Sequence, residues 1–220
     1  HAEQGQGDTI QMMRYVPIIA AQAAKIVLDV PVSLASMICD IPNAVVLRQG
    51  DVVPDFDIHC PFMSLPLAFG TTLETLPDHV PYLRVPENKV EKWCSLLGHR
   101  KHPRIGLVWS GATGHRNDHN RSISLQRLFP FFDLDAEYHS LQVEYRNDEQ
   151  KMLASTGRIV DHSKDIVDYS DTAALIELMD LVISVDTSVA HLAGALGKPV
   201  WIMLPHVPDW RWLLDREDSP

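Results

Sequence analysis

The chain has 220 residues, of which 45% are hydrophobic and 22% charged, a balance typical of a globular protein and not of a disordered one. Its formal net charge of −10 argues against a nucleic-acid partner, because nucleic-acid surfaces need clustered Lys and Arg. No stretch reaches the roughly 18 consecutive apolar residues that span a bilayer, so we expect no transmembrane segment and a cytoplasmic protein.

The cysteines and the chain ends add two expectations. Cys39, Cys60 and Cys94 are an odd number without metal-ligand spacing, so we expect reduced, mostly buried thiols. The sequence begins without an initiator Met and stops at Ser219-Pro220, which indicates an excerpt of a longer protein.

In the first part of the chain, short β-branched runs alternate with amphipathic segments. The predicted elements are a loop over Glu3–Thr9, a helix over Thr9–Ala24, a strand over Lys25–Val30, a short helix opened by Pro31, a strand over Ala44–Arg48, an apolar stretch over Phe56–Leu67 beside or across the sheet, and a linker over Val80–Lys101 with a helix at Val90–Leu97.

The second part predicts a βαβαβαβ order, as a doubly wound parallel sheet requires, with ligands at the carboxyl ends of its strands. The predicted elements are a strand over Arg104–Trp109, a polar loop over Ser110–Ser124, a helix over Leu125–Phe132, a strand over Tyr138–Val143, a helix over Asp148–Ser155, a strand over Arg158–Val160, a helix over Thr172–Met179, a strand over Leu181–Val185, a helix over Thr187–Leu196 and a strand over Pro199–Leu204.

The most informative turn, Asp186–Ser188, joins a predicted strand to a predicted helix within Leu181–Leu204. The turn leaves free N–H groups at Thr187, Ser188 and Val189 in front of the helix dipole, which is an arrangement that binds anions. His191, one turn on, adds a donor if it faces the same cleft. The alternative is structural: Asp186 or Thr187 caps the helix, and His191 is a core histidine.

The run DTSVAHLAGALGKPVW, with DTAALIELMDLVISV before it, resembles the carboxyl-terminal half of glycosyltransferase family 9, the heptosyltransferase-like enzymes. The resemblance implies that Asp186, Thr187, Ser188 and His191 bind the diphosphate of a nucleotide-sugar donor. Members of that family often carry Gly after the Thr, whereas this chain has Ser188, so the nucleotide preference can differ.

The front loop, Gly5 to Thr9, lies before an amphipathic helix, and Gly5 and Gly7 allow a tight turn and close approach of a ligand. By the same resemblance, Asp8 is the general base of an inverting transfer, and Gly5, Gly7 and Thr9 line the cleft on the acceptor side. Helix capping by Asp8 or Thr9 is the alternative.

The string EQGQGDTIQMMRY, with HCPFMSLPLAFGT and PDWRWLLDREDSP, looks like the catalytic module found behind tetratricopeptide repeats in bacterial proteins. Those modules are related in architecture to O-linked N-acetylglucosamine transferases. The resemblance covers nearly the whole chain and implies tetratricopeptide repeats elsewhere in the full-length protein.

Basic residues of the polar loop are further donor-site candidates. Positive side chains here would support the leaving diphosphate, and Arg121 is preferred, with Arg116 as the alternative. A solvated loop remains the structural interpretation.

Other candidates are weaker. His59 is expected to line the cleft while Cys60 packs into the core, because neighbours on a strand face opposite sides. Gln142 is a weak candidate for contacting the nucleotide. Trp201, Trp210 and Trp212 are interpreted as packing residues.

These interpretations predict an α/β, GT-B-like fold of two Rossmann-like domains with parallel sheets that face a central cleft. Residues 1–100 form the acceptor side, and residues 101–220 bind the nucleotide sugar. The predicted function is inverting transfer of a sugar to a hydroxyl of a protein or glycan, without metal or cofactor, because the resemblance implies that a helix dipole and basic side chains replace Mg²⁺. The alternatives are a non-catalytic nucleotide-sugar scaffold or sensor attached to helical repeats, and a sugar-nucleotide epimerase, for which no matching residue set is visible.

Overall fold

The computed structural model describes residues 1–146 and 148–219 and contains two parallel sheets. β1 (Ile26–Val30) pairs with β2 (Ala44–Arg48) in the first. The second has five strands in the order β5-β4-β3-β6-β7. Because this order steps outwards in both directions from β3, the second sheet is doubly wound, as the sequence predicted.

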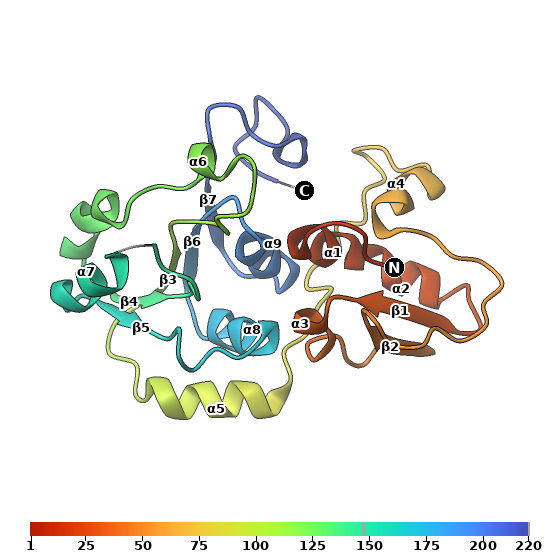
Figure 1. The fold of residues 1–220 in the computed structure, drawn as a ribbon, viewed down its shortest axis with the longest axis horizontal. Helices are drawn as coiled ribbons and strands as arrows, with labels where there is room; N and C mark the ends of the chain where they lie inside the picture. Colours follow the sequence, from red (N-terminus) through yellow and green to blue (C-terminus); the bar gives the residue numbers. More distant parts are fainter. Residues whose placement is uncertain (147, 220) are drawn as a thin grey trace.

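Helices connect the strands of the five-stranded sheet along the chain (Figure 1). Each strand is short, and in β6 the side chains of Val182, Ser184 and Val185 are fully buried. The elements are β3 (Arg104–Val108), α6 (Asp118–Arg121), η3 (Leu125–Asp133), β4 (Glu137–Ser140), α7 (Glu149–Thr156), β5 (Ile159–Asp161), α8 (Tyr169–Glu177), β6 (Leu181–Val185), α9 (Ser188–Ala195), β7 (Val200–Met203) and η4 (Trp210–Trp212).

The predicted helix over Thr9–Ala24 is wrong in its start and its continuity. The chain forms α1 (Gln6–Met12), a 3₁₀ turn η1 (Met13–Tyr15) and α2 (Val16–Ala20). Gly5 is the N-cap of α1, and its N–H donates to Asp8, which explains the earlier start. Pro17 lacks the N–H that a continuous helix would bond to Met13, so the helix is interrupted there.

One other prediction differs from the structure in type. The segment predicted as a helix from Leu125 is a 3₁₀-helix, and Pro130 inside it removes an α-helical hydrogen bond. The apolar stretch Phe56–Leu67 does not cross the sheet but packs beside it: Phe62 in η2 (Phe62–Ser64) and Leu65 in α4 (Leu65–Ala68) are buried in the same cluster as Leu28 of β1, whereas Phe56 is exposed.

The two sheets lie on either side of residue 100 in the sequence, but their elements share one apolar core. Ile10 and Leu34 belong to the same buried cluster as Leu175 and Val182, and α1 packs directly against α9. Domains that face a central cleft therefore stay a prediction, as does the boundary at residue 100.

Helix α5 (Glu87–Leu97) connects the first part of the chain to the second and packs on α8, below it in the view (Figure 1). Asp171 of α8 is fully buried and accepts hydrogen bonds from Lys89 and Lys92, both at 2.9 Å, and from Trp93 Nε1 at 3.1 Å. This cluster fixes α5 to the five-stranded sheet. α3 (Val32–Ala35) completes the first part.

The cysteines are free, but the expectation that they are mostly buried is wrong. Cys39 and Cys94 are exposed, and Cys60 is partly buried against the core. None of the helices described has the length and apolar character needed to span a bilayer.

Candidate functional site

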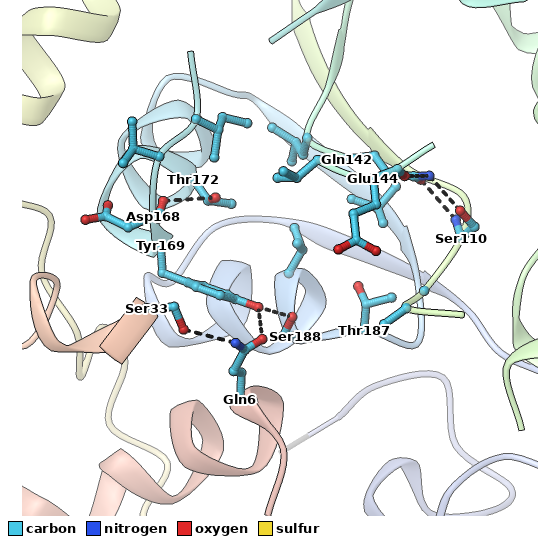
Figure 2. A pocket seen from close by; sticks show the side chains of 18 residues that line it. Gln6, Ser33, Ser110, Gln142, Glu144, Asp168, Tyr169, Thr172, Thr187 and Ser188 are labelled. Carbon is cyan, nitrogen blue, oxygen red and sulfur yellow. Dashed lines mark hydrogen bonds between the residues drawn. The ribbon is translucent and has the colours of Figure 1, made fainter. Parts of the chain in front are cut away.

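A pocket of about 310 Å³ lies at the carboxyl ends of β3, β4 and β6. Its volume falls within the range of about 300–1,000 Å³ that small-molecule sites occupy, and its position is that of ligand sites in doubly wound sheets. Figure 2 shows that side chains from the first and second parts of the chain surround it. Its polar lining residues are Gln6, Ser33, Ser110, Gln142, Glu144, Asp168, Tyr169, Thr172, Thr187 and Ser188.

The free amino terminus of α9 forms one wall of this pocket. Thr187 is the N-cap residue with extended backbone, but its hydroxyl lies 3.1 Å from Ser184 Oγ and does not cap the helix. Within the described residues, no acceptor is present for the N–H groups of Thr187, Ser188 and Val189. With the helix dipole behind them, these groups are suited to an anion.

The charged side chains of the pocket are acidic. Glu144 and Asp168 line it, whereas no Lys or Arg does so in the part of the chain that the structure describes. Asp168 is engaged elsewhere, because it caps α8 and accepts from Ser36 Oγ at 2.7 Å. An anionic ligand in this pocket therefore depends on backbone N–H groups and hydroxyls.

A hydrogen-bonded chain crosses the pocket between the two parts of the molecule (Figure 2). The Tyr169 hydroxyl lies 2.6 Å from Ser188 Oγ and donates to Gln6 Oε1 at 2.8 Å. Gln6 Nε2 in turn donates to Ser33 Oγ at 3.0 Å. This chain fixes the Ser188 hydroxyl and ties α1 and α3 to α8 and α9.

His191 does not line the pocket but packs between α1 and the carboxyl-terminal segment. Its ring stacks on Trp212 with a centroid separation of 4.9 Å and an interplanar angle of 18°. Burial, with the nearby charges of Arg211 and Arg14, lowers the pKa of His191 to about 4. The imidazole is therefore neutral at pH 7 and acts as a neutral donor or acceptor.

The Asp8 carboxylate has two partners. One oxygen accepts the Gly5 N–H at 2.9 Å, and the other forms an ion pair with Arg211. The Arg211 guanidinium also donates to Asp209 at 2.7 Å and lies over the Trp210 ring, 4.7 Å from its centroid. The Asp8 side chain therefore takes part both in the cap of α1 and in the ion pair with Arg211.

Comparison with known proteins identifies the fold. The model of glycosyltransferase family 9 (heptosyltransferase) matches residues 167–202, which hold α8, β6 and α9. A glycosyl transferase family 9 structure from Veillonella parvula DSM 2008 superposes with a TM-score of 0.64 at 11% identity, over 91% of this chain and 78% of that chain. The chain has the fold of glycosyltransferase family 9.

A second solved structure agrees. The E. coli ADP-heptose LPS heptosyltransferase II superposes with a TM-score of 0.58 at 11% identity, over 91% of this chain and 82% of its own. No curated protein matches the sequence. The predicted kinship with modules behind tetratricopeptide repeats and with O-linked N-acetylglucosamine transferases stays a prediction.

In this family 9 fold, the polar loop does not bring its arginines to the pocket. Arg121 donates through Nη1 to the backbone oxygen of Asp186 at 2.8 Å, and its guanidinium lies against Gly111. Arg121 therefore supports the turn before α9. Arg116 is exposed and does not line the pocket, contrary to expectation. Burial raises the pKa of Asp186, whose side chain also lies outside the pocket lining.

Gln142 lies at the strand end, as predicted, but its amide is committed to the protein. Its oxygen accepts the N–H of Ser110 at 3.1 Å, and its nitrogen donates to Ser110 Oγ at 2.6 Å and to the Glu144 carbonyl at 2.7 Å. Gln142 therefore fixes the loop after β3 while it lines the pocket.

The predicted residues of the front loop lie together at the first turn of α1, whereas His59 lies elsewhere. Gly7 packs against His191, and Thr9 is buried with its hydroxyl bonded to the Gly5 carbonyl at 3.3 Å. His59 does not line the pocket, since its exposed ring contacts His1 and Phe56, and its place in an acceptor cleft stays a prediction. The stretch around His59 forms no strand, so the alternation on which that prediction depended does not apply.

The prediction that Trp201, Trp210 and Trp212 are packing residues is confirmed only for Trp212. Trp212 is 8% exposed and packs on His191, whereas Trp201 and Trp210 are 64% and 63% exposed. Exposed indole rings of this size are available for contacts that the chain itself does not make.

The polar loop contains one histidine pair, His115 and His119, at a four-residue spacing that metal sites use on helices. Both side chains are exposed, and His115 Nδ1 accepts the Asn117 N–H at 3.2 Å. Across residues 1–146 and 148–219, no group of three His, Cys, Asp or Glu residues could hold a metal ion.

Sequence reasoning missed Tyr169, Gln6 and Arg211. A signal for Tyr169 was present: Asp168 accepts from the N–H groups of Ser170 and Asp171 and so begins α8 before the predicted Thr172. Arg211 gave no such signal, because it meets Asp8 across 203 positions of sequence.

Proposed function

We propose that this chain is a glycosyltransferase that moves a sugar, with inversion, from a nucleotide-diphosphate-sugar donor to a hydroxyl group of a protein or glycan. The proposal is carried by the free amino terminus of α9 in the pocket, which lies within the stretch that the family 9 model matches. It is consistent with the fold shared with two solved proteins of that kind.

The donor diphosphate lies at the N–H groups of Thr187, Ser188 and Val189 in this proposal. Arg121 holds the turn from behind through the carbonyl of Asp186, and Gln142 holds the loop after β3. Since backbone N–H groups and a helix dipole stabilise the negative charge of a leaving diphosphate, the transfer needs no metal ion.

Asp8 acts as the general base. It takes the proton of the acceptor hydroxyl, whose oxygen bonds to the anomeric carbon while the bond from that carbon to the diphosphate oxygen breaks. The nucleoside diphosphate leaves with the bonding electron pair. Gly5, Gly7 and Thr9 hold Asp8 through the first turn of α1.

The first test is calorimetric titration with UDP, ADP, GDP and CDP in the presence of EDTA. We expect one nucleotide to bind saturably. Ser188→Pro removes an N–H at the first position of α9, where proline fits because Thr187 has an extended backbone. Since a hydrogen bond to a charged group contributes about 1.5–3 kcal/mol, Ser188→Pro should weaken binding roughly 10- to 100-fold.

Ser188→Ala is the matched control, because it removes the hydroxyl and keeps the N–H; its affinity should stay much closer to that of the wild type. An equal loss of nucleotide affinity in both variants would show that the Ser188 hydroxyl, and not its N–H, contacts the nucleotide. A folded chain that binds none of the four nucleotides contradicts the donor site.

Turnover is tested separately with Asp8→Asn, which keeps the shape of the side chain but cannot accept the proton. We expect donor affinity within about twofold and turnover reduced by about 10²–10⁴-fold, the usual contribution of a general base. Unchanged turnover would remove Asp8 from the mechanism.

A second candidate is a non-catalytic nucleotide-sugar scaffold or sensor, joined to tetratricopeptide repeats in a longer chain. The pocket lining favours it: among the described residues no Lys or Arg lines the pocket, whereas such side chains commonly stabilise a leaving diphosphate. A donor that binds but is neither transferred nor hydrolysed over many hours identifies this alternative.

A further inference from the structure

Residues 209–212, here called the carboxyl strap, contact both motifs that the proposed function uses. The strap contains η4 and follows β7 in the second part of the chain, yet it reaches Asp8 of α1 in the first part.

Arg211 is the strap residue that reaches Asp8. Its side chain is 14% exposed, and three contacts restrict it: the ion pair with Asp8, the bond to Asp209 at 2.7 Å, and the face of Trp210. A guanidinium held at this many points has little rotational freedom left, so it fixes the carboxylate that it meets.

The Asp8 carboxylate is consequently fixed through both oxygens. The Gly5 N–H holds one oxygen and Arg211 holds the other. Without Arg211, the Gly5 contact would be the only one left among the described residues, and the carboxylate could rotate about it.

Trp212 is the strap residue that contacts the second motif, at His191 of α9. It is 8% exposed and stacks on the His191 ring, which also packs against Gly7. Strap and α1 thus enclose His191, and a displaced strap would release Asp8 and His191 together.

We propose that the carboxyl strap is part of the active site: Arg211 is a positioning residue that orients the Asp8 carboxylate, and Trp212 positions His191. This inference rests on the proposed function for its effect on turnover, but the coupling of Arg211 to Asp8 does not. A base misplaced by about 1 Å loses on the order of 10²-fold in rate, so the strap governs turnover more than donor binding.

The activity test compares Arg211→Ala, Arg211→Lys and Arg216→Ala. Arg216 carries the same charge four residues from the strap and pairs only with Asp218 among the described residues, so it controls for loss of a positive charge. For Arg211→Ala we expect kcat to fall on the order of 10²-fold with the donor KM within about threefold. Arg211→Lys should retain part of the rate, and Arg216→Ala should match the wild type.

Chemical rescue separates positioning from structural damage. Guanidinium chloride at about 20 mM, far below the molar range that unfolds proteins, should restore several-fold activity to Arg211→Ala and none to Asp8→Ala. A rate of Arg211→Ala equal to that of the wild type, or a fall confined to donor KM, overturns the positioning role.

A substrate-free measurement distinguishes this inference from the proposed function. In urea unfolding, the Asp8→Asn and Arg211→Ala variants should each lower the midpoint, and the double variant should lose clearly less than the sum of the two. If the wild type transfers no sugar, the proposed function fails, while non-additive midpoints still support the contact. Additive midpoints overturn the inference, whatever the activity.

Discussion

Gly7 lies against the imidazole of His191 so closely that a Cβ at Gly7 would stand 2.8 Å from Cδ2 of that ring. The same Cβ would be 3.4 Å from the Cα of Ser188. His191 has no room to retreat, because Trp212 stacks on it. The glycine of the front loop is therefore required by helix packing, and it sets how closely α1 and α9 approach at the proposed site.

Gly7→Ala should lower the free energy of unfolding by about 1–3 kcal/mol, the usual cost of overpacking, and should weaken nucleotide binding by displacing α1. Gly194→Ala on α9 is the matched control, because nothing lies within 4 Å of the added Cβ. There the free energy should stay the same or rise by up to about 1 kcal/mol, since alanine favours a helix. Urea unfolding measures both, and a Gly7→Ala variant as stable as the wild type contradicts the close packing.

How far the sequence predicts this fold depends on the range of the forces involved. The strands Ala44–Arg48 and Leu181–Val185 have the predicted bounds, because short apolar runs between turn signals identify them locally. Pro17 is a local signal in the sequence for the break after α1.

The site was predictable only where it is local. The strand–turn–helix pattern of the sequence predicts the turn Thr187–Val189, and this turn lines the pocket. Arg121 lies behind that turn, not in front of it, because tertiary packing decides which side of a loop meets a ligand. The contact between Asp8 and Arg211 comes only from the folded chain.

Tyr169→Phe should weaken the link across the pocket. It removes the hydroxyl that meets Ser188 at 2.6 Å and Gln6 at 2.8 Å, and each lost hydrogen bond contributes about 0.5–1.5 kcal/mol. We expect the free energy of unfolding to fall by about 1–2 kcal/mol. Gln6→Ala should cost less, and the double variant less than the sum, because the two residues share one bond. Strict additivity in urea unfolding contradicts the shared bond.

The paired imidazoles of His139 and His162 should make the chain sensitive to mild acid. They lie 3.0 Å apart and are buried, and burial lowers the pKa of His139 to about 4 and that of His162 in the same direction. The unfolded chain takes up a proton on His139 near pH 6.5, whereas the folded chain does not until about pH 4, and His162 shifts in the same direction. Stability is therefore lost as pH falls through this window, by up to about 1.4 kcal/mol per pH unit for each proton.

His139→Gln should flatten this pH dependence between pH 7 and 5, measured as the free energy of unfolding in urea. His99→Gln is the control, since His99 is exposed. Equal slopes for His139→Gln and the wild type would show that the pair titrates normally in the folded chain.

Asp171 gives a pH dependence of the same sign, at lower pH. Burial disfavours its charge, but the hydrogen bonds from Lys89, Lys92 and Trp93 outweigh this and hold its pKa at about 2. A carboxyl group with a lowered folded pKa stabilises the protein above its unfolded value of about 3.9, and this contribution is lost as pH falls toward 2. Asp171→Asn should lower the free energy of unfolding at pH 7 by about 1.5–3 kcal/mol, because charged hydrogen bonds are replaced. It should also lose the wild-type dependence on pH between 4 and 2. Asp165→Asn is the control, since Asp165 is exposed. If Asp171→Asn is as stable as the wild type at pH 7, α5 is held to α8 by apolar packing and not by this carboxylate.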